Sequence, residues 1–270
     1  MSDLSYHRLI AEALSHLPLQ KGDTIWIAAD LTRLAALHAE KKQRFQPAMF
    51  ATYILDSIQP GTILIPGFVN TYVPGVVFDK QHTMPVTGAL SKWALKSQLF
   101  KRNADPFHSF FIKGEKADLY ASVLSESSFG KDSVFDVLYQ EKAKFLLWDV
   151  DFQYAFTFAH FVEEMMQVSY RHYKVYDIPV IQNGSSIQQQ IKLYEKKPGY
   201  KLSLFPLKKM LSENGACREG SYKNCSWSMV DLHQAYQLLS DDIQKHGGKN
   251  FVNFDSFQWC KDRIKGLFSL

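Results

Sequence analysis

The amino-acid sequence predicts an α/β fold, in which the strands of a sheet alternate with helices along the chain. Apolar, β-rich runs at residues 23–28 and 62–65 flank a helical segment at 47–58, which is closed by a proline and a glycine. Two strands that are joined through a helix over about 30 residues are typical of a parallel βαβ unit. A further apolar run at 145–150 indicates another central strand.

The other elements of the first half follow from spacing and composition. Residues 5–19 carry apolar side chains at the three- and four-residue spacing of an amphipathic helix. Segment 67–85 is rich in Pro, Gly and Asn without periodicity, so it predicts a long loop, and such loops are usually functional. Residues 88–99 predict a helix, and residues 107–113 alternate as a strand does.

The second half is predicted to contain a hairpin and a helix. Strand-like residues over 170–193 flank an Asn-Gly turn at 183–184, which is a strong hairpin signal. Residues 231–245 have the pattern of an amphipathic helix and are followed by two glycines. Since no repeat or linker interrupts the chain, we predict a single domain over 1–270, whose part from about residue 200 is mostly helical.

Composition excludes several classes of protein. With 46% hydrophobic and 21% charged residues, the chain is typical of globular proteins. It has no apolar run of about 18 residues, so no membrane span is expected. It also lacks a secretory signal pattern, and its net charge of +4 is spread along the chain rather than gathered in a nucleic-acid-binding stripe. Three cysteines without a C-x-x-C pattern favour a reduced, cytoplasmic setting. Because zinc-site patterns such as H-E-x-x-H are absent, no metal is expected.

The most informative segment is TFAHFVEE at 157–164, which opens a predicted helix soon after the strand at 145–150. Thr157, His160 and Glu163 are three residues apart, so their side chains fall on one helix face. Open α/β sheets bind their ligands at the carboxyl ends of strands. The histidine is therefore either a catalytic group or a core histidine that a carboxylate satisfies.

This segment resembles the T-x-x-H-x-x-E motif of the aminoglycoside 3-N-acetyltransferase family, and further landmarks of that family recur in the same order. The other similar segments are GDTIWIAADLTR at 22–33, PGTILIPGF at 60–68, MPVTGAL at 84–90, DPFHS at 105–109 and FGKDS at 129–133. The resemblance implies a three-layer α/β/α domain on a mixed, largely parallel sheet. It also implies acetylation of an amine, with acetyl-CoA as co-substrate.

By this resemblance, His160 matches the general base that removes a proton from the acceptor amine. An imidazole suits this task because its pKa lies near neutral pH. Glu163 would either support the ring or take part in the chemistry. Glu195, in the segment LYEKK, is similar to a family carboxylate that assists the base, although a surface glutamate paired with neighbouring lysines has the same sequence.

The coenzyme is expected at the end of the first strand, where backbone amides of the following turn can bind a pyrophosphate. The family has serines in this turn, whereas this chain has an acid and an arginine, so backbone contacts and the arginine are expected to bind the phosphates. A structural role for the DPFHS segment remains an alternative. The residues expected to bind acetyl-CoA are Asp30, Leu31, Thr32, Arg33, Thr87, Gly88, His108 and Ser109.

The expected acceptor site departs from the family pattern. Members that act on polycationic aminoglycosides have acids in the loop after the second strand, but residues 69–77 contain none, and Lys197 occupies a second such position. Like charges repel, so we expect a single amine on a neutral or anionic amino sugar, including a nucleotide-linked one. Asn70, Tyr72 and Thr157 are the expected contacts to this substrate.

Two other functions remain open at this point. One is acetylation of aminoglycoside antibiotics, and the other is a catalytically weak relative that binds a CoA-like ligand. The expected partner is a small-molecule substrate and not a nucleic acid or a membrane. The sequence leaves the oligomeric state open, with a homodimer among the options.

Overall fold

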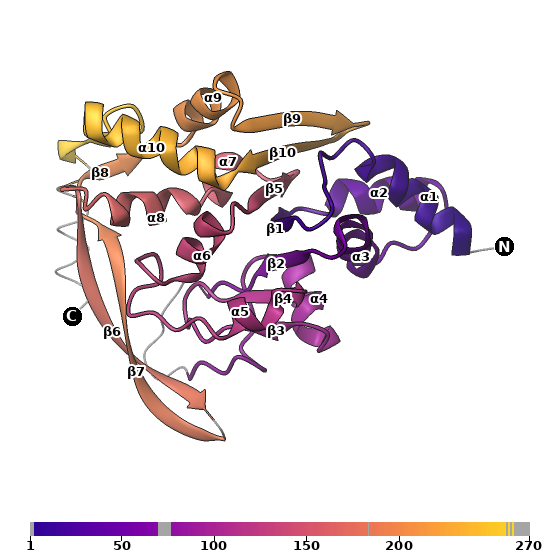
Figure 1. The fold of residues 1–270 in the computed structure, drawn as a ribbon, viewed down its shortest axis with the longest axis horizontal. Coiled ribbons are helices and arrows are strands. Elements are labelled where there is room, and N and C mark those ends of the chain that lie inside the picture. Colours follow the sequence, from indigo (N-terminus) through magenta and orange to yellow (C-terminus); the bar gives the residue numbers. More distant parts are fainter. Residues whose placement is uncertain (1–2, 70–76, 183, 258, 260, 262–270) are drawn as a thin grey trace.

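The computed structural model describes residues 3–69, 77–182, 184–257, 259 and 261. Within this part of the chain, the largest sheet has seven strands in the order β3-β4-β2-β1-β5-β10-β9 (Figure 1). Its strands are β1 (Thr24–Ala29), β2 (Thr62–Pro66), β3 (Lys101–Arg102), β4 (Phe110–Gly114), β5 (Lys144–Trp148), β9 (Cys217–Tyr222) and β10 (Cys225–Asp231).

The sheet is mixed, but among the described residues only the pairs β1–β2 and β1–β5 are parallel. The predicted βαβ unit accounts for the first pair, because α3 (Pro47–Ile58) connects β1 to β2. The neighbours farther out, β4 beside β2 and β10 beside β5, are antiparallel, as are both edge strands. The expectation of a largely parallel sheet is therefore wrong. The connections at 103–109, between β3 and β4, and at 223–224, between β9 and β10, are too short to contain a crossover helix. The strands that they join therefore pair antiparallel.

Helices pack on both faces of the sheet. Side chains alternate along β1, so that Ile25 and Ile27 join one hydrophobic core while Trp26 joins the other. Helices of the first core are α1 (Asp3–Leu14), α2 (Thr32–Glu40), α3 and α4 (Ala89–Ser97). Helices of the second core are α5 (Ala117–Ala121), α6 (Val134–Gln140), α7 (Phe152–Ala155), α8 (Phe158–Met165), α9 (Phe205–Glu213) and α10 (Leu232–His246).

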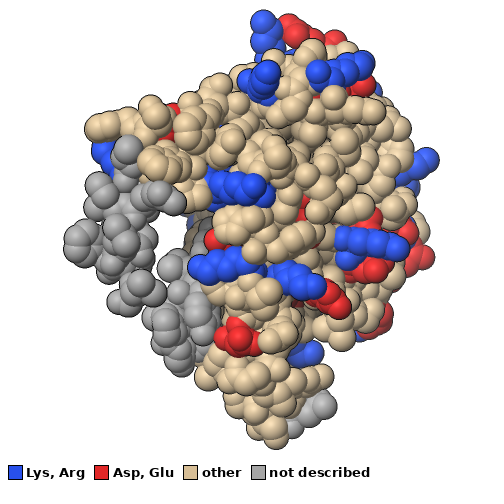
Figure 2. All heavy atoms as spheres, turned by 90° about the vertical axis from the view of Figure 1, so that its left-hand side faces the viewer, with Lys and Arg blue, Asp and Glu red and all other residues tan. Residues whose placement is uncertain are grey.

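A long antiparallel hairpin of β6 (Arg171–Gln182) and β7 (Ser185–Lys196) lies against one end of the molecule (Figure 1), which confirms the predicted hairpin. On the face that it presents, lysine and arginine side chains lie dispersed among neutral and acidic ones (Figure 2). The apolar cluster that holds the hairpin to the body consists of Phe78, Phe107, Ile178, Val180 and Ile191.

The part of the chain from about residue 200 differs from the mostly helical segment expected. Besides α9 and α10, it contains β9 and β10, which extend the main sheet, and a small antiparallel pair of β8 (Tyr200–Leu202) and β11 (Val252–Phe254). β9 lies at the edge of the sheet and has the polar sequence CREGSY. Because it lacks an apolar run, the sequence did not predict this strand. Among the described helices, none is long and apolar enough to cross a membrane.

Gly114, at the end of β4, is constrained by the neighbouring strand β2. Its φ is +130°, and a methyl group on its Cα would lie 2.6 Å from the Cα of Thr62. Left-handed strain and this overlap with backbone should together lower the free energy of unfolding of Gly114→Ala by about 2–5 kcal/mol. The measurement is urea denaturation.

The matched control is Gly215→Ala, because Gly215 has a φ of +76° but no atom within 4 Å of an added methyl group. This variant should lose only the left-handed strain, about 1–2 kcal/mol. Equal losses in the two variants would contradict the close approach of β4 to β2.

Candidate active site

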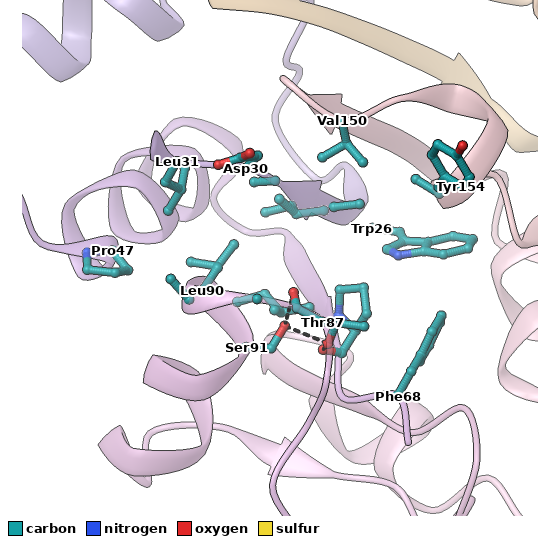
Figure 3. A pocket seen from close by; sticks show the side chains of 18 of the residues that line it. Trp26, Asp30, Leu31, Pro47, Phe68, Thr87, Leu90, Ser91, Val150 and Tyr154 are labelled. Carbon is teal, nitrogen blue, oxygen red and sulfur yellow. Dashed lines mark hydrogen bonds between the residues drawn. The ribbon is translucent and has the colours of Figure 1, made fainter. Parts of the chain in front are cut away.

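A cavity of about 1000 Å³ lies at the carboxyl ends of β1, β2 and β5 (Figure 3). Residues at or just beyond these strand ends, namely Ala29, Pro66 and Val150, line it together with apolar side chains such as Leu31 and Leu90. The strands concerned are the parallel ones, and open α/β sheets bind ligands outside the carboxyl ends of such strands. The fold therefore provides a mainly apolar ligand cavity at the expected edge.

The N-terminus of α4 faces this cavity. Thr87 and Gly88 line the cavity just before the helix, and Gly88 has a φ of +96°. The Thr87 hydroxyl donates to the Pro66 carbonyl at 2.6 Å and lies 2.9 Å from the Ser91 hydroxyl (Figure 3). Because the first turn of α4 carries no acidic residue, its backbone amides present partial positive charge to a bound anion.

The turn after β1 also borders the cavity, but its charges are engaged. Asp30 accepts a hydrogen bond from the Thr32 backbone amide at 2.9 Å, and hydrogen bonds from Thr32 lower the pKa of this carboxyl. Arg33 is not among the residues that line the cavity. Its Nη1 donates to Asp149 Oδ1 at 3.1 Å and to the Asn224 carbonyl at 3.2 Å.

His160, in the first turn of α8, also lines the cavity. Its Nδ1 lies 2.9 Å from Oε2 of Glu163, one helical turn later, whose side chain is fully buried. Arg171, the first residue of β6, places Nη2 at 2.7 Å from the same carboxylate oxygen. Since Nδ1 is engaged and the His160 side chain is 29% exposed, Nε2 is the ring nitrogen available to a ligand.

The protonation of this group is set by burial and by the two charged neighbours. Burial lowers the pKa of His160, and the positive charge of Arg171 lowers it further, although Glu163 acts in the opposite direction. Burial alone would raise the pKa of Glu163, but His160 and Arg171 together hold it below its ordinary value. The arrangement therefore favours a neutral imidazole beside an ionised carboxylate, which is the state that a general base requires.

The structure separates the two residues of the predicted His108-Ser109 pair. His108 lines the cavity, and its ring packs 4.4 Å from the Phe129 ring and 5.1 Å from the Phe68 ring. Burial, together with the nearby His160, lowers the pKa of His108 to about 3, so this ring stays neutral.

Ser109 instead belongs to a buried network around Arg102. The Ser109 hydroxyl donates to the Gly67 carbonyl at 2.8 Å and accepts from Arg102 Nε at 2.9 Å. The same guanidinium donates to the Gly67 carbonyl at 2.6 Å and to the Thr83 carbonyl at 2.7 Å. Burial lowers the pKa of Arg102 to about 10, so it remains charged near neutral pH. Ser109 is thus hydrogen-bonded within the fold to Arg102 and Gly67, which agrees with the structural role that was one of the two alternatives for this segment.

Of the other residues predicted for the site, Thr157 lies at the cavity and Glu195 does not. Thr157 lines the cavity, and its hydroxyl donates to the Ala155 carbonyl at 3.2 Å. Glu195 lies on β7, outside the cavity lining, and accepts a hydrogen bond from the Tyr176 hydroxyl. The predicted substrate contacts Asn70 and Tyr72 lie outside the described residues.

Sequence analysis missed Arg171, which contacts both residues of the His160–Glu163 pair. Nothing in the sequence around Arg171 signals this, because the contact joins two elements that only the tertiary fold brings together. In the described part of the chain, no group of three or more His, Cys, Asp or Glu side chains could hold a metal ion.

Comparison with known proteins identifies the family. The family model for aminoglycoside 3-N-acetyltransferase matches residues 59–243. The solved structure of AAC-IIIb in a binary complex with CoASH is 18% identical, with a TM-score of 0.75 over 88% of this chain and 96% of that chain. AAC(3)-Xa is 17% identical, with a TM-score of 0.76 over 89% of this chain and 93% of that chain.

A third similar structure is AAC-VIa bound to sisomicin, which is 14% identical, with a TM-score of 0.71 over 89% of this chain and 97% of that chain. No curated protein sequence matches the chain. The structural matches show a shared fold, and the family model covers most of the chain. The chain therefore belongs to the aminoglycoside 3-N-acetyltransferase family and is an acyl-CoA-dependent N-acyltransferase.

Proposed function

We propose that this protein transfers the acetyl group of acetyl-CoA to the amine of an amino sugar, by direct transfer within a ternary complex. The observation that carries the proposal is the His160–Glu163 pair in the wall of the cavity. The cavity volume of about 1000 Å³ is in the upper part of the range for small-molecule sites, which suits two reactants together. AAC-IIIb binds CoASH, which supports acetyl-CoA as the donor.

The proposed reaction needs one base and no covalent intermediate on the protein. Nε2 of His160 takes a proton from the acceptor ammonium, and the free amine attacks the thioester carbonyl. The resulting tetrahedral intermediate expels the thiolate of coenzyme A, which takes up the proton held by the imidazolium. The surplus proton of the attacking nitrogen is lost to solvent as the amide forms, so one proton is released in each turnover. Glu163 accepts a hydrogen bond from Nδ1 and stabilises the charged ring. Holding the two reactants together supplies much of the remaining acceleration.

The coenzyme phosphates are proposed to bind at the entrance of the cavity, near the first turns of α2 and α4. The N-terminal amides of α4, after Thr87 and Gly88, are the better anion site, because Asp30 already occupies the Thr32 amide at the start of α2. Arg33 carries a 58% exposed side chain and could exchange its partner Asp149 for a phosphate. Leu31 and His108 would then contact the less polar part of the coenzyme.

For the acceptor, we propose a sugar with one amine on a neutral or anionic scaffold. Residues 69–77 contain no acid, and Lys197 lies where a family carboxylate is expected. Lys197 donates to the Ser169 carbonyl at 2.6 Å, beside the strand that carries Glu195. Thr157, with Asn70 and Tyr72, is proposed to contact the sugar. The alternative acceptor is an aminoglycoside, because AAC-VIa binds sisomicin.

His160→Ala should lower kcat/KM for acetyl transfer about 10²- to 10⁴-fold, the usual contribution of a general base. The dissociation constant for acetyl-CoA should change little, which calorimetry measures. The control is His172→Ala, which replaces an exposed histidine of β6 and should keep full activity. If His160→Ala keeps more than about a tenth of the rate, His160 is not the base.

Arg33→Ala should raise the KM for acetyl-CoA about fivefold, because an exposed guanidinium–phosphate pair is modest in strength. The effect should shrink with an acetylated pantetheine donor, which lacks the nucleotide phosphates. Steady-state kinetics with the two donors make this comparison. Equal losses with both donors would place Arg33 away from the phosphates.

Mono-amino sugars should be acetylated with a kcat/KM at least about tenfold above that of gentamicin or kanamycin. An acceptor with several ammonium groups would meet like charge and unpaired donors, each costing about 1–3 kcal/mol. Sugars linked to a nucleoside diphosphate should be the best acceptors. All acceptors are to be compared at one ionic strength, because salt screens charge.

Two results would replace this assignment of the acceptor. Gentamicin turnover as fast as that of every mono-amino sugar tested would favour an antibiotic-modifying enzyme. Binding of acetyl-CoA without turnover of any amine would favour a catalytically weak relative.

A further inference from the structure

The buried guanidinium of Arg171 touches both members of the His160–Glu163 pair. Its side chain is only 6% exposed. Nη1 donates to the Tyr194 carbonyl of β7 at 2.8 Å, which fixes the group from behind. Nη2 lies 2.7 Å from Glu163 Oε2 and 2.8 Å from His160 Nδ1. His160 of α8 and Arg171 of β6 therefore meet at one carboxylate oxygen, and β7 holds the guanidinium through the Tyr194 carbonyl.

The charges at this point decide where the imidazole hydrogen lies. A guanidinium can only donate hydrogen bonds, and an ionised carboxylate can only accept them. If His160 carried its hydrogen on Nε2, its Nδ1 lone pair would accept a hydrogen bond from Arg171 Nη2 at 2.8 Å, but it would also face the Glu163 carboxylate at 2.9 Å and be repelled by it. With the hydrogen on Nδ1, both His160 and Arg171 donate to Oε2 of Glu163. That arrangement leaves the Nε2 lone pair free for the acceptor.

We propose that Arg171 is a positioning residue for the base: it fixes the Glu163 carboxylate against Nδ1 and keeps the His160 ring neutral until a substrate proton arrives. This inference rests on the proposed role of His160. Arg171 acts through Glu163 and His160, so it need not touch either substrate. Its place in the sequence, at the start of the hairpin, links the hairpin to the catalytic helix.

Among the described residues, three titratable or charged groups face His160 from the elements packed around it. Glu163 comes from the same helix, Arg171 from β6, and His108 from the segment before β4, beside the apolar ring of Phe129. His108 is neutral, so it adds no charge near pH 7. The protonation of His160 is thus set by burial and by the balance of Glu163 against Arg171.

The sign of the effect follows from this balance. Arg171 opposes the imidazolium, so it keeps His160 deprotonated down to a lower pH. When the guanidinium is removed, only burial still opposes the effect of Glu163 on the ring, and the pKa of His160 should rise. A larger share of the enzyme would then carry a charged ring that cannot accept a proton near pH 7.

The test is the pH dependence of kcat/KM for Arg171→Met. The acid limb should move to higher pH by about one unit or more. Much of the rate should return above that limb, and the KM for acetyl-CoA should stay close to that of the wild type. Arg171→Lys keeps the charge, so its acid limb should lie near that of the wild type. Arg218→Met, which removes an exposed arginine of β9, should leave the profile unchanged.

A merely structural role would give a different result. Arg171→Met would then lower the rate by the same factor at every pH, with the acid limb in place, and that outcome overturns the proposal. Removing one partner of a buried ion pair is strongly destabilising, so this variant can fail to fold. In that case, Glu163→Gln and the double variant Arg171→Met/Glu163→Gln decide the question. The acid limb should lie higher in the double variant, and identical limbs overturn the proposal.

Histidine NMR titration separates this inference from the proposed function. The His160 resonance, assigned with His160→Ala, should titrate at higher pH in Arg171→Met than in the wild type, with no substrate present. A shift in the titration together with full activity of His160→Ala would contradict the base assignment while supporting the charge effect of Arg171. An unchanged titration would overturn the effect of Arg171, whatever the activity of His160→Ala.

Discussion

The position of His160 depends on the burial of one face of α8 against the sheet. Phe158, Phe161 and Val162 have no exposed surface and belong to the larger hydrophobic core, so the helix cannot rotate without exposing them. The adjoining face then presents His160 to the cavity and carries Glu163 into the interior. The hydrophobic effect thus fixes the geometry of the His160–Glu163 pair, and the polar groups adjust to it.

The neighbouring carboxyls of α8 show how the same burial has opposite effects. Glu163 and Glu164 are both buried, but the pKa of Glu163 is lowered because His160 and Arg171 provide positive or donating partners. The pKa of Glu164 is raised, since burial outweighs its hydrogen bond from the Ser127 hydroxyl at 2.9 Å. Adjacent residues of one type therefore have pKa values that are displaced in opposite directions. A buried carboxylate stays ionised only where a cation compensates the lost water.

Features that depend on local spacing could be predicted from the sequence, and those that depend on tertiary contacts could not. The strand–helix–strand unit and the hairpin were predicted, as was the shared face of His160 and Glu163, because each follows from the periodicity of a helix or strand. The pairing of Arg33 with Asp149 joins residues far apart in the sequence, as does the contact of Arg171 with Glu163. The antiparallel edges escaped prediction for a different reason, since edge strands carry too few apolar residues to be recognised.

The network around Arg102 has a consequence for how this enzyme could diversify. The Arg102 guanidinium donates hydrogen bonds to the carbonyls of Gly67, just after β2, and of Thr83, which precedes α4. A single side chain therefore holds both ends of the segment between these two residues. Mutations between those points can change the size and polarity of the intervening segment while β2 and the start of α4 keep their places. The ends of this segment are therefore held independently of its sequence, so the fold can tolerate variation between Gly67 and Thr83.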